Sequence, residues 1–265
     1  MNPKIHTALQ IREVFHLEFL RWFSRKLGPD QYALKGGTNL RFFFRSMRYS
    51  EDMDIDVQRV RVERVKKTVM DILSARELAE SLKFFGIEKI IQPDIIKAKQ
   101  TETTQRFKIH LLTSGGEDFF TKIDFSRRGL KGSVAVEPVS AEILRSYKMA
   151  PLLVPHYEAA SAVEQKIQAL ALRSILQARD IFDLFLLSSQ VDSSQDRRPQ
   201  VSKAVLGVAY ENIFLAGFSQ FRDTVVNYLG VEDQKVYSSP AVWDEIKLKT
   251  AHFLEGIKNQ AANFS

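Results

Sequence analysis

Apolar residues recur along the first half of the chain with two different periods. Between residues 4 and 27 they cover one broad side of a helix, which Gly28 and Pro29 end. Tyr32–Lys35 and the alternating run Met53–Val57 predict short strands, and residues 60–84 again show a helical spacing. Five more strands are expected at residues 87–91, 95–99, 106–112, 119–125 and 134–138, with a hairpin turn at residues 115–116.

From residue 140 onward the spacing of apolar residues is helical. Pro151 and Pro155 mark a junction near residues 150–156. Helices are then expected at about residues 158–173, 177–190, 201–229 and 240–258, with a polar loop at 192–200. This order predicts an α+β fold, in which a mixed sheet flanked by helices is followed by a C-terminal helical domain. We expect the domains to comprise residues 1–150 and 151–265.

The composition excludes several kinds of chemistry. The chain has no cysteine, which rules out disulfides, zinc–thiolate sites and thiol nucleophiles. Its five histidines show no metal-ligand spacing. No apolar run approaches the roughly 18 residues of a membrane span, and the N-terminus lacks the apolar region of a signal peptide. We therefore expect a cytoplasmic protein that has no membrane partner.

The positive charge is concentrated in the first half of the chain. The formal net charge is +6 and the pI is about 9.4. Residues 1–130 contain 24 lysines and arginines against 17 aspartates and glutamates, whereas residues 131–265 contain 14 against 15. Such an excess attracts a polyanionic partner such as RNA. A general contribution to solubility explains the charge equally well.

Three aspartates alternate with apolar residues in and just before the second predicted strand. Because strand side chains repeat every two residues, Asp52, Asp54 and Asp56 share one face. Neighbouring members lie roughly 6.6–6.8 Å apart. Two of them, either Asp52 and Asp54 or Asp54 and Asp56, can therefore bind one Mg²⁺, which uses one or two carboxylates together with substrate phosphates. The alternative is an exposed edge strand with a solvated acidic face.

A glycine turn precedes this strand. Gly36 and Gly37 lie between a predicted strand and a helix expected at residues 39–45. Their backbone N–H groups can approach a phosphate, and a helix N-terminus favours negative charge. The hydroxyl of Thr38 can add a further donor. The turn is not a Walker loop, because the Gly-Lys-Ser/Thr ending is missing. The alternative is an ordinary turn with Thr38 as the helix N-cap.

Together the two motifs resemble the polymerase-β-like nucleotidyltransferases. Gly-Gly-Thr is followed after thirteen residues by Asp-Met-Asp, and residues 34–41 and 48–54 are similar to the AbiEii/AbiGii toxin family. The resemblance implies a turn that binds a nucleoside triphosphate, formed by Gly36, Gly37 and Thr38. It also implies a metal pair formed by Asp52 and Asp54, with Asp56 in reserve. Two Mg²⁺ ions are expected, for which Mn²⁺ can substitute.

A third carboxylate completes the metal site in that superfamily. Asp124 is the candidate, because it lies in the strand expected at residues 119–125. On that strand it shares a face with Lys122. The alternative is a surface aspartate that only pairs with Lys122.

A lysine followed by Arg-Asp-x-x-Asp in the C-terminal half resembles the helical motif of the same family. In one straight helix Lys166 and Asp180 would lie about 21 Å apart, so we expect a break near residues 174–177 if both act in one site. Asp180 and Asp183 are three residues apart and share a helix face. The resemblance implies that Lys166 contacts the triphosphate and that the aspartates position it, an arginine or the base. The alternative is an interhelical ion-pair set with Arg173 and Arg179.

The sequence thus predicts a metal-dependent nucleotidyltransferase that moves a nucleoside monophosphate from a nucleoside triphosphate to an acceptor. The expected catalytic set is Asp52, Asp54, Asp124, Lys166, Asp180 and Asp183. The resemblance implies the 3′ end of tRNA as acceptor, a toxin of a toxin–antitoxin or phage-defence system, and a separate antitoxin. The alternatives are transfer to a protein hydroxyl or a small molecule, a non-catalytic nucleotide-binding protein, and a nuclease.

Overall fold

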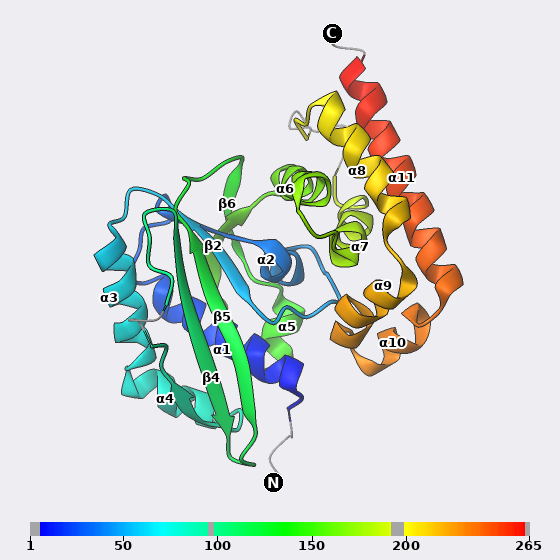
Figure 1. Cartoon of the computed structure of the whole chain (residues 1–265). Helices are drawn as coiled ribbons and strands as arrows, with labels where there is room; N and C mark the ends of the chain where they lie inside the picture. Colours follow the sequence, from blue (N-terminus) through cyan, green and yellow to red (C-terminus); the bar gives the residue numbers. More distant parts are fainter. Residues whose placement is uncertain (1–5, 95–97, 192–198, 263–265) are drawn as a thin grey trace. The chain divides into compact units, whose positions relative to one another are not determined.

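The computed structural model describes residues 6–94, 98–191 and 199–262 (Figure 1). The chain forms two compact units. Unit 1 comprises Met1–Phe43 and Tyr49–Tyr157, and unit 2 comprises Phe44–Arg48 and Glu158–Ser265. The chain therefore passes between the units after residues 43, 48 and 157. None of the described helices combines the length and the apolar character needed to cross a membrane.

Unit 1 is built on a seven-stranded mixed sheet. The strands are β1 (Tyr32–Lys35), β2 (Met53–Val57), β3 (Ile87–Ile91), β4 (Thr104–Thr113), β5 (Asp118–Ser126), β6 (Val134–Pro138) and β7 (Leu153–Tyr157). Their order across the sheet is β3-β4-β5-β2-β1-β7-β6. The pairs β1–β7 and β2–β5 are parallel, and the other neighbours are antiparallel. This sheet confirms the predicted α+β class.

Helices of unit 1 cover one face of this sheet. They are α1 (Ala8–Phe23), α3 (Val62–Leu73) and α4 (Arg76–Lys83), whereas α2 (Gly36–Phe43) packs against β1 and β2, and α5 (Ala141–Ser146) precedes β7 (Figure 1). Alternate strand residues such as Ile55, Ile123 and Phe125 are fully buried in the core under α1. The residues between them face the other side of the sheet, which is polar and carries the aspartates.

Unit 2 is helical, as the spacing of its apolar residues predicts. Its helices are α6 (Ala159–Leu172), α7 (Ala178–Leu187), α8 (Lys203–Leu215), α9 (Phe218–Thr224), the 3-10 turn η1 (Val226–Tyr228), α10 (Val231–Tyr237) and α11 (Pro240–Ala262). Helix α6 packs against α7 and α8, and α11 packs against the same two helices. Trp243 of α11 stacks on Phe221 of α9 with ring centroids 4.3 Å apart.

Three predicted elements of unit 1 differ from the structure. Residues 60–84 form two helices, because Ser74 ends α3 and the extended Ala75 begins α4. Helix α2 begins at Gly36, so Thr38 is its third residue and not its N-cap. The junction predicted near residues 150–156 is the strand β7, which contains Pro155. Pro155 lies opposite Val136 of β6, and the register of β7 with β1 contains only Leu34 and His156.

Two further differences concern other stretches of the chain. The helix predicted over residues 201–229 is interrupted, because the extended Gly217 separates α8 from α9. Helix α10 was not predicted, and it buries no residue, so it has no apolar stripe to detect. Residues 95–97 of the strand expected at 95–99 lie outside the described residues, and residues 98–99 are not in a strand. Most of the loop expected at 192–200 also lies outside them.

Candidate functional site

A row of four charged residues crosses the open face of the sheet in unit 1. Asp54 of β2 is in register with Asp124 of the parallel strand β5. Lys35 of β1 lies opposite Asp54, and Arg106 of β4 lies opposite Asp124. Since neighbouring strands are about 4.7–4.9 Å apart, the two aspartates stand side by side, with one cation on each flank. Asp52, two residues before Asp54, lies in the same region of this face, although it is 72 residues from Asp124 in the sequence.

Arg106 and Lys122 hold the carboxylates of Asp124 and Asp52. Arg106 donates from Nε and Nη2 to the two carboxylate oxygens of Asp124, at 2.7 and 2.8 Å. Lys122 Nζ lies 2.6 Å from Asp52 Oδ2. The hydrogen bonds to Asp124 raise the pKa of Arg106, and the charges of Asp124, Asp52 and Asp54 add to this. All three predicted metal ligands therefore act on one guanidinium, although they come from two separate strands.

Crowding of negative charge also affects Asp52. Burial raises the pKa of Asp52 above its ordinary value, and the nearby carboxylates of Glu51 and Asp124 raise it further. The hydrogen bond and the charge of Lys122 act in the opposite direction. The pKa thus reports a site in which added positive charge would stabilise the ionised carboxylate.

Gly36 brings the glycine turn into direct contact with the carboxylate strand. Its φ of +67° lies in the left-handed region, which residues with a Cβ rarely adopt. A Cβ at this position would lie 2.7 Å from Asp54 Oδ2 and 3.4 Å from the Cβ and Cγ of Asp54. Two independent constraints therefore require glycine here. Gly37 follows as the second residue of α2.

Hydroxyl groups fix the backbone that leads into β2. Thr38 Oγ1 donates to the carbonyl of Asp52 at 2.9 Å, and Ser50 Oγ donates to the same oxygen at 2.8 Å. Thr38 is buried, and its proton is used in this bond. In the structure Thr38 therefore holds the position of Asp52.

A second chain of hydrogen bonds reaches the same backbone from α1. Thr121 Oγ1 donates to the carbonyl of Glu51 at 2.6 Å, and His16 Nε2 lies 2.9 Å from Thr121 Oγ1. Burial, with a smaller effect of Arg12, lowers the pKa of His16 to about 3. Because the Thr121 proton is used on Glu51, the neutral His16 donates from Nε2.

Asp56 lies on the same face but is tied to other residues. Lys35 Nζ is 2.5 Å from Asp56 Oδ1, and the hydroxyl of Tyr157 donates to Oδ2 at 2.7 Å. Burial, together with the negative charge of Asp56, raises the pKa of Tyr157. Asp56 is itself buried. Asp56 Oδ1 is thus in an ion pair and Oδ2 accepts a hydrogen bond, at a position two residues after Asp54 in β2.

The helical motif forms a buried ion-pair network within unit 2. The helix breaks between Leu172 and Ala178, as expected. This break lets Lys166 Nζ reach Asp180 Oδ1 at 3.0 Å and Asp183 Oδ2 at 2.6 Å. Arg173 Nη1 lies 2.8 Å from Asp180 Oδ2. The Arg173 pair of the alternative ion-pair set is therefore present, whereas Arg179 is exposed, and Lys166 is held by both aspartates.

Arg48 belongs to this network, and no role for it was predicted. Its guanidinium donates to both carboxylate oxygens of Asp183 at 3.1–3.2 Å, and both side chains are buried. Burial alone would raise the pKa of Asp183, but the charges of Arg48 and Lys166 outweigh it and lower the pKa below its ordinary value. The only sequence signal was the position of Arg48 at the start of the motif at residues 48–54.

The donor atoms on the open face suit a hard cation. Asp54 and Asp124 offer two adjacent carboxylates, and Mg²⁺ is commonly bound by one or two carboxylates together with substrate phosphates. Asp124 is held by Arg106 through both oxygens and Asp52 is held by Lys122, so a cation bound by either carboxylate would have to displace these partners. Across the described ranges, no group of three or more His, Cys, Asp or Glu side chains is arranged to hold one metal ion. The fit is therefore to two carboxylates, with Asp52 next to them.

Comparison with known proteins identifies the family. The model of the AbiEii nucleotidyl transferase toxins, described as belonging to type IV toxin–antitoxin systems, matches residues 18–229. The chain belongs to the AbiEii family. This match includes the glycine turn, the carboxylate row and the helical motif, and it confirms the resemblance seen in the sequence. No curated protein sequence matches the chain.

Solved structures share the fold of this AbiEii protein. JHP933 from Helicobacter pylori superimposes with a TM-score of 0.55 at 17% identity, covering 98% of this chain and 96% of that one. The nucleotidyltransferase toxin MenT4 (Rv2826c) from Mycobacterium tuberculosis H37Rv gives a TM-score of 0.59 at 17% identity, covering 94% and 84%. At this level of identity the likeness establishes the arrangement of helices and strands.

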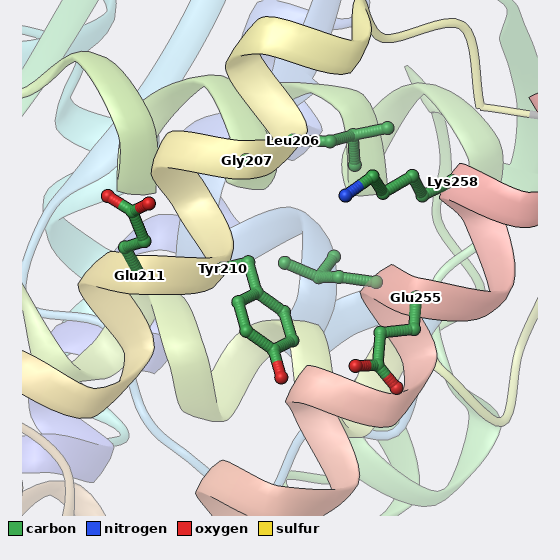
Figure 2. A pocket seen from close by; sticks show the side chains of 7 residues that line it. Leu206, Gly207, Tyr210, Glu211, Glu255 and Lys258 are labelled. Atoms are coloured by element: carbon green, nitrogen blue, oxygen red, sulfur yellow. The ribbon is translucent and has the colours of Figure 1, made fainter.

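Two hollows lie among residues other than those of the sequence motifs. One, of about 200 Å³, lies between α8 and α11 of unit 2, where Tyr210 and Glu255 face each other (Figure 2). Glu255 accepts a hydrogen bond from Tyr210 and raises its pKa. The other, of about 690 Å³, is lined by α1, the end of α4 and the end of α5 in unit 1. Neither hollow is lined by a residue of the charged row.

Proposed function

We propose that this AbiEii protein transfers a nucleoside monophosphate from a nucleoside triphosphate to the 3′ end of an RNA, with tRNA as the expected acceptor. The observation that supports this is the charged row beside Gly36. In this row Asp54 and Asp124 stand in register, and the charges of both and of Asp52 raise the pKa of Arg106. Phosphoryl transfer requires positioning and charge stabilisation more than covalent chemistry. Adjacent carboxylates beside a backbone that can approach phosphate provide both.

Each residue then has a definable task in unit 1. The backbone N–H groups of Gly36 and Gly37 would bind phosphate oxygens at the N-terminus of α2. Asp54 and Asp124 would hold Mg²⁺ or Mn²⁺, with Asp52 next to them. The divalent cation would neutralise phosphate charge and lower the pKa of the acceptor hydroxyl. Thr38 would keep Asp52 in place through its bond to the Asp52 carbonyl.

The helical motif of unit 2 would supply positive charge. We propose that Lys166 binds the triphosphate as a point charge, and that Asp180 and Asp183 hold its ammonium group in one orientation. A lysine that is buried and fixed by two carboxylates loses little conformational freedom when it binds an anion. The family further implies growth arrest as the outcome and an antitoxin as partner.

The test compares Asp54→Asn with Asp71→Asn, a change of the same kind at an exposed position of α3. The purified proteins are incubated with each labelled nucleoside triphosphate, Mg²⁺ or Mn²⁺, and total cell RNA. We expect label in RNA with the wild-type protein and Asp71→Asn, and about 100- to 1,000-fold less with Asp54→Asn. EDTA should abolish transfer.

The outcomes separate the alternatives. Full transfer by Asp54→Asn would refute the role of the row. Label on protein would indicate transfer to a protein hydroxyl. RNA shortening in the absence of nucleotide would indicate a nuclease, and nucleotide binding without transfer would indicate a non-catalytic protein.

A further inference from the structure

The open face of β4 and β5 continues beyond the charged row as an orderly set of residue pairs. One step along the strands from Arg106 and Asp124, Lys108 lies directly opposite Lys122. One further step along, His110 lies opposite Phe120. The side chains of each pair share the open face, because same-face residues repeat every two positions. The face thus presents, in order, the carboxylates, two lysines and two aromatic rings.

The lysine pair is an arrangement that sheets usually avoid. Residues directly opposite on antiparallel strands have Cβ atoms about 4.5–5.5 Å apart, and like charges there are destabilising. Lys122 is neutralised by Asp52 at 2.6 Å. Lys108 is exposed, and no carboxylate of the described residues pairs with it. An anion above this pair would supply the counter-charge that Lys108 lacks among the described residues.

The aromatic pair lies farther from the carboxylates. Phe120 is 38% exposed, although it sits on a strand face, and its ring contacts His110 edge-on at 5.4 Å between centroids. His110 Nδ1 lies 3.0 Å from Asp118 Oδ1. Phe120 therefore has part of a ring open to a ligand, while His110 is fixed by Asp118. From Asp124 to Phe120 the strand spans about 13–14 Å.

We propose that this face of β4 and β5 binds the single-stranded 3′ segment of the acceptor RNA, with phosphates over Lys108 and Lys122 and a base stacked on Phe120. This inference rests on the proposed function, since it assigns a path to the acceptor of that reaction. A positive track that follows the backbone, with aromatic side chains for the bases, is how proteins hold single-stranded nucleic acid without sequence preference. Sheet faces with exposed aromatics are used in this way by RNA-binding domains.

An acidic peptide is a poorer fit to the same surface. Both strands lie inside the sheet, where β4 pairs with β3 and β5, and β5 pairs with β4 and β2. Their backbone groups are thus engaged, and an extended peptide could not add as a further strand. A nucleic acid needs only side-chain charge and ring faces. The track also leads directly to Asp124, where an acceptor hydroxyl has to arrive.

Binding is measured by fluorescence anisotropy with a labelled 12-nucleotide single-stranded RNA that has a free 3′ hydroxyl. Every protein carries Asp54→Asn so that no turnover occurs. Lys108→Glu and Phe120→Ala are compared with Lys66→Glu, an exposed lysine of α3, and Phe84→Ala, which removes a ring that is 88% exposed after α4. Thermal unfolding confirms that all four variants fold, and titration with nucleoside triphosphate is the second readout.

We expect Lys108→Glu to weaken RNA binding about tenfold and to reduce the slope of log Kd against log salt by about 1. Phe120→Ala should weaken binding about fivefold or more and leave the salt slope unchanged. The two control variants should stay within about twofold of the parent protein, and nucleotide binding should not change in any of the four.

Equal RNA affinity in Lys108→Glu and Lys66→Glu, or in Phe120→Ala and Phe84→Ala, would overturn the inference. Competition by polyglutamate as effective as that by unlabelled RNA would overturn it in favour of an acidic protein partner. The assay needs no turnover, so it reads out RNA binding even if no transfer is found. Lys108→Glu and Phe120→Ala are also made without Asp54→Asn, and if both of these proteins transfer nucleotide to RNA at the wild-type rate, the inference fails while the proposed function stands.

Discussion

Replacing Gly36 with alanine should damage the site more than the fold. The position has φ of +67°, and a left-handed conformation costs a residue with a Cβ about 1–2 kcal/mol. The new Cβ would also lie 2.7 Å from Asp54 Oδ2, a distance that Cβ atoms essentially never show. Since β2 is fixed between β1 and β5, the Asp54 side chain has to move. A displacement of about 1 Å at a reacting group can reduce the rate about 100-fold.

Gly116→Ala supplies a matched control. Gly116, in the turn between β4 and β5, has φ of +85°, and a Cβ there would meet nothing within 4 Å. Both variants should therefore lose about 1–2 kcal/mol from the backbone, which thermal unfolding should show as a fall of about 2–8 °C. Only Gly36→Ala should lose activity, with kcat/KM for nucleotidyl transfer about 100-fold below that of Gly116→Ala.

The reasoning would be refuted by equal kcat/KM in the two variants. That result would mean either that the turn adapts without moving Asp54 or that the position of Asp54 does not limit the reaction. If Gly36→Ala unfolds at a much lower temperature than Gly116→Ala, the rates are compared at a temperature where both proteins are folded.

Three further predictions concern buried polar groups. The folded pKa of His16 is about 3 and its unfolded pKa about 6.5, so the unfolded chain binds the extra proton between these values. Denaturant titrations should therefore show stability falling by up to about 1.4 kcal/mol per pH unit as the pH drops through that window, and His16→Gln should lose this dependence. Asp56→Asn should retain transfer within about tenfold, unlike Asp54→Asn, but lose about 1–3 kcal/mol of stability; inactivity at full stability would return Asp56 to the metal set. Asp183→Asn should lose about 3–5 kcal/mol in chemical denaturation, because Arg48 is left without its carboxylate; an unchanged midpoint would contradict this.

The sequence was most informative where periodicity and local chemistry agree. The bounds of β1 and β2 were predicted as observed, because each short strand is limited by turn residues and one of them alternates strictly. The break between α6 and α7 followed from the distance that a straight helix would impose. Helix α10 lacks a buried side, so no apolar period marked it.

Arg106 and Arg48 could not be assigned from the sequence, for a different reason. Arg106 lies 18 residues from Asp124, and Arg48 lies 135 residues from Asp183. The first pair depends on the register between β4 and β5, and the second on the packing of the segment at residues 44–48 in unit 2. Neither register nor packing is encoded in a short window. Basic residues are also common on solvated surfaces, so their type alone carries little information.

The alternation within β2 connects stability and chemistry at the level of single residues. Met53 and Ile55 are fully buried in the core, while Asp54 between them belongs to the charged row. A slip of one residue in the pairing with β5 would move the aspartate into the core and the apolar residues to the open face. Such a slip is strongly unfavourable, because burying a charge without a partner is costly. The apolar face of β2 therefore fixes the register that places Asp54 beside Asp124. Ile55→Val should then reduce stability by about 0.5–1.5 kcal/mol with little change in kcat/KM below the melting transition. Asp54→Asn should instead reduce kcat/KM with little change in stability.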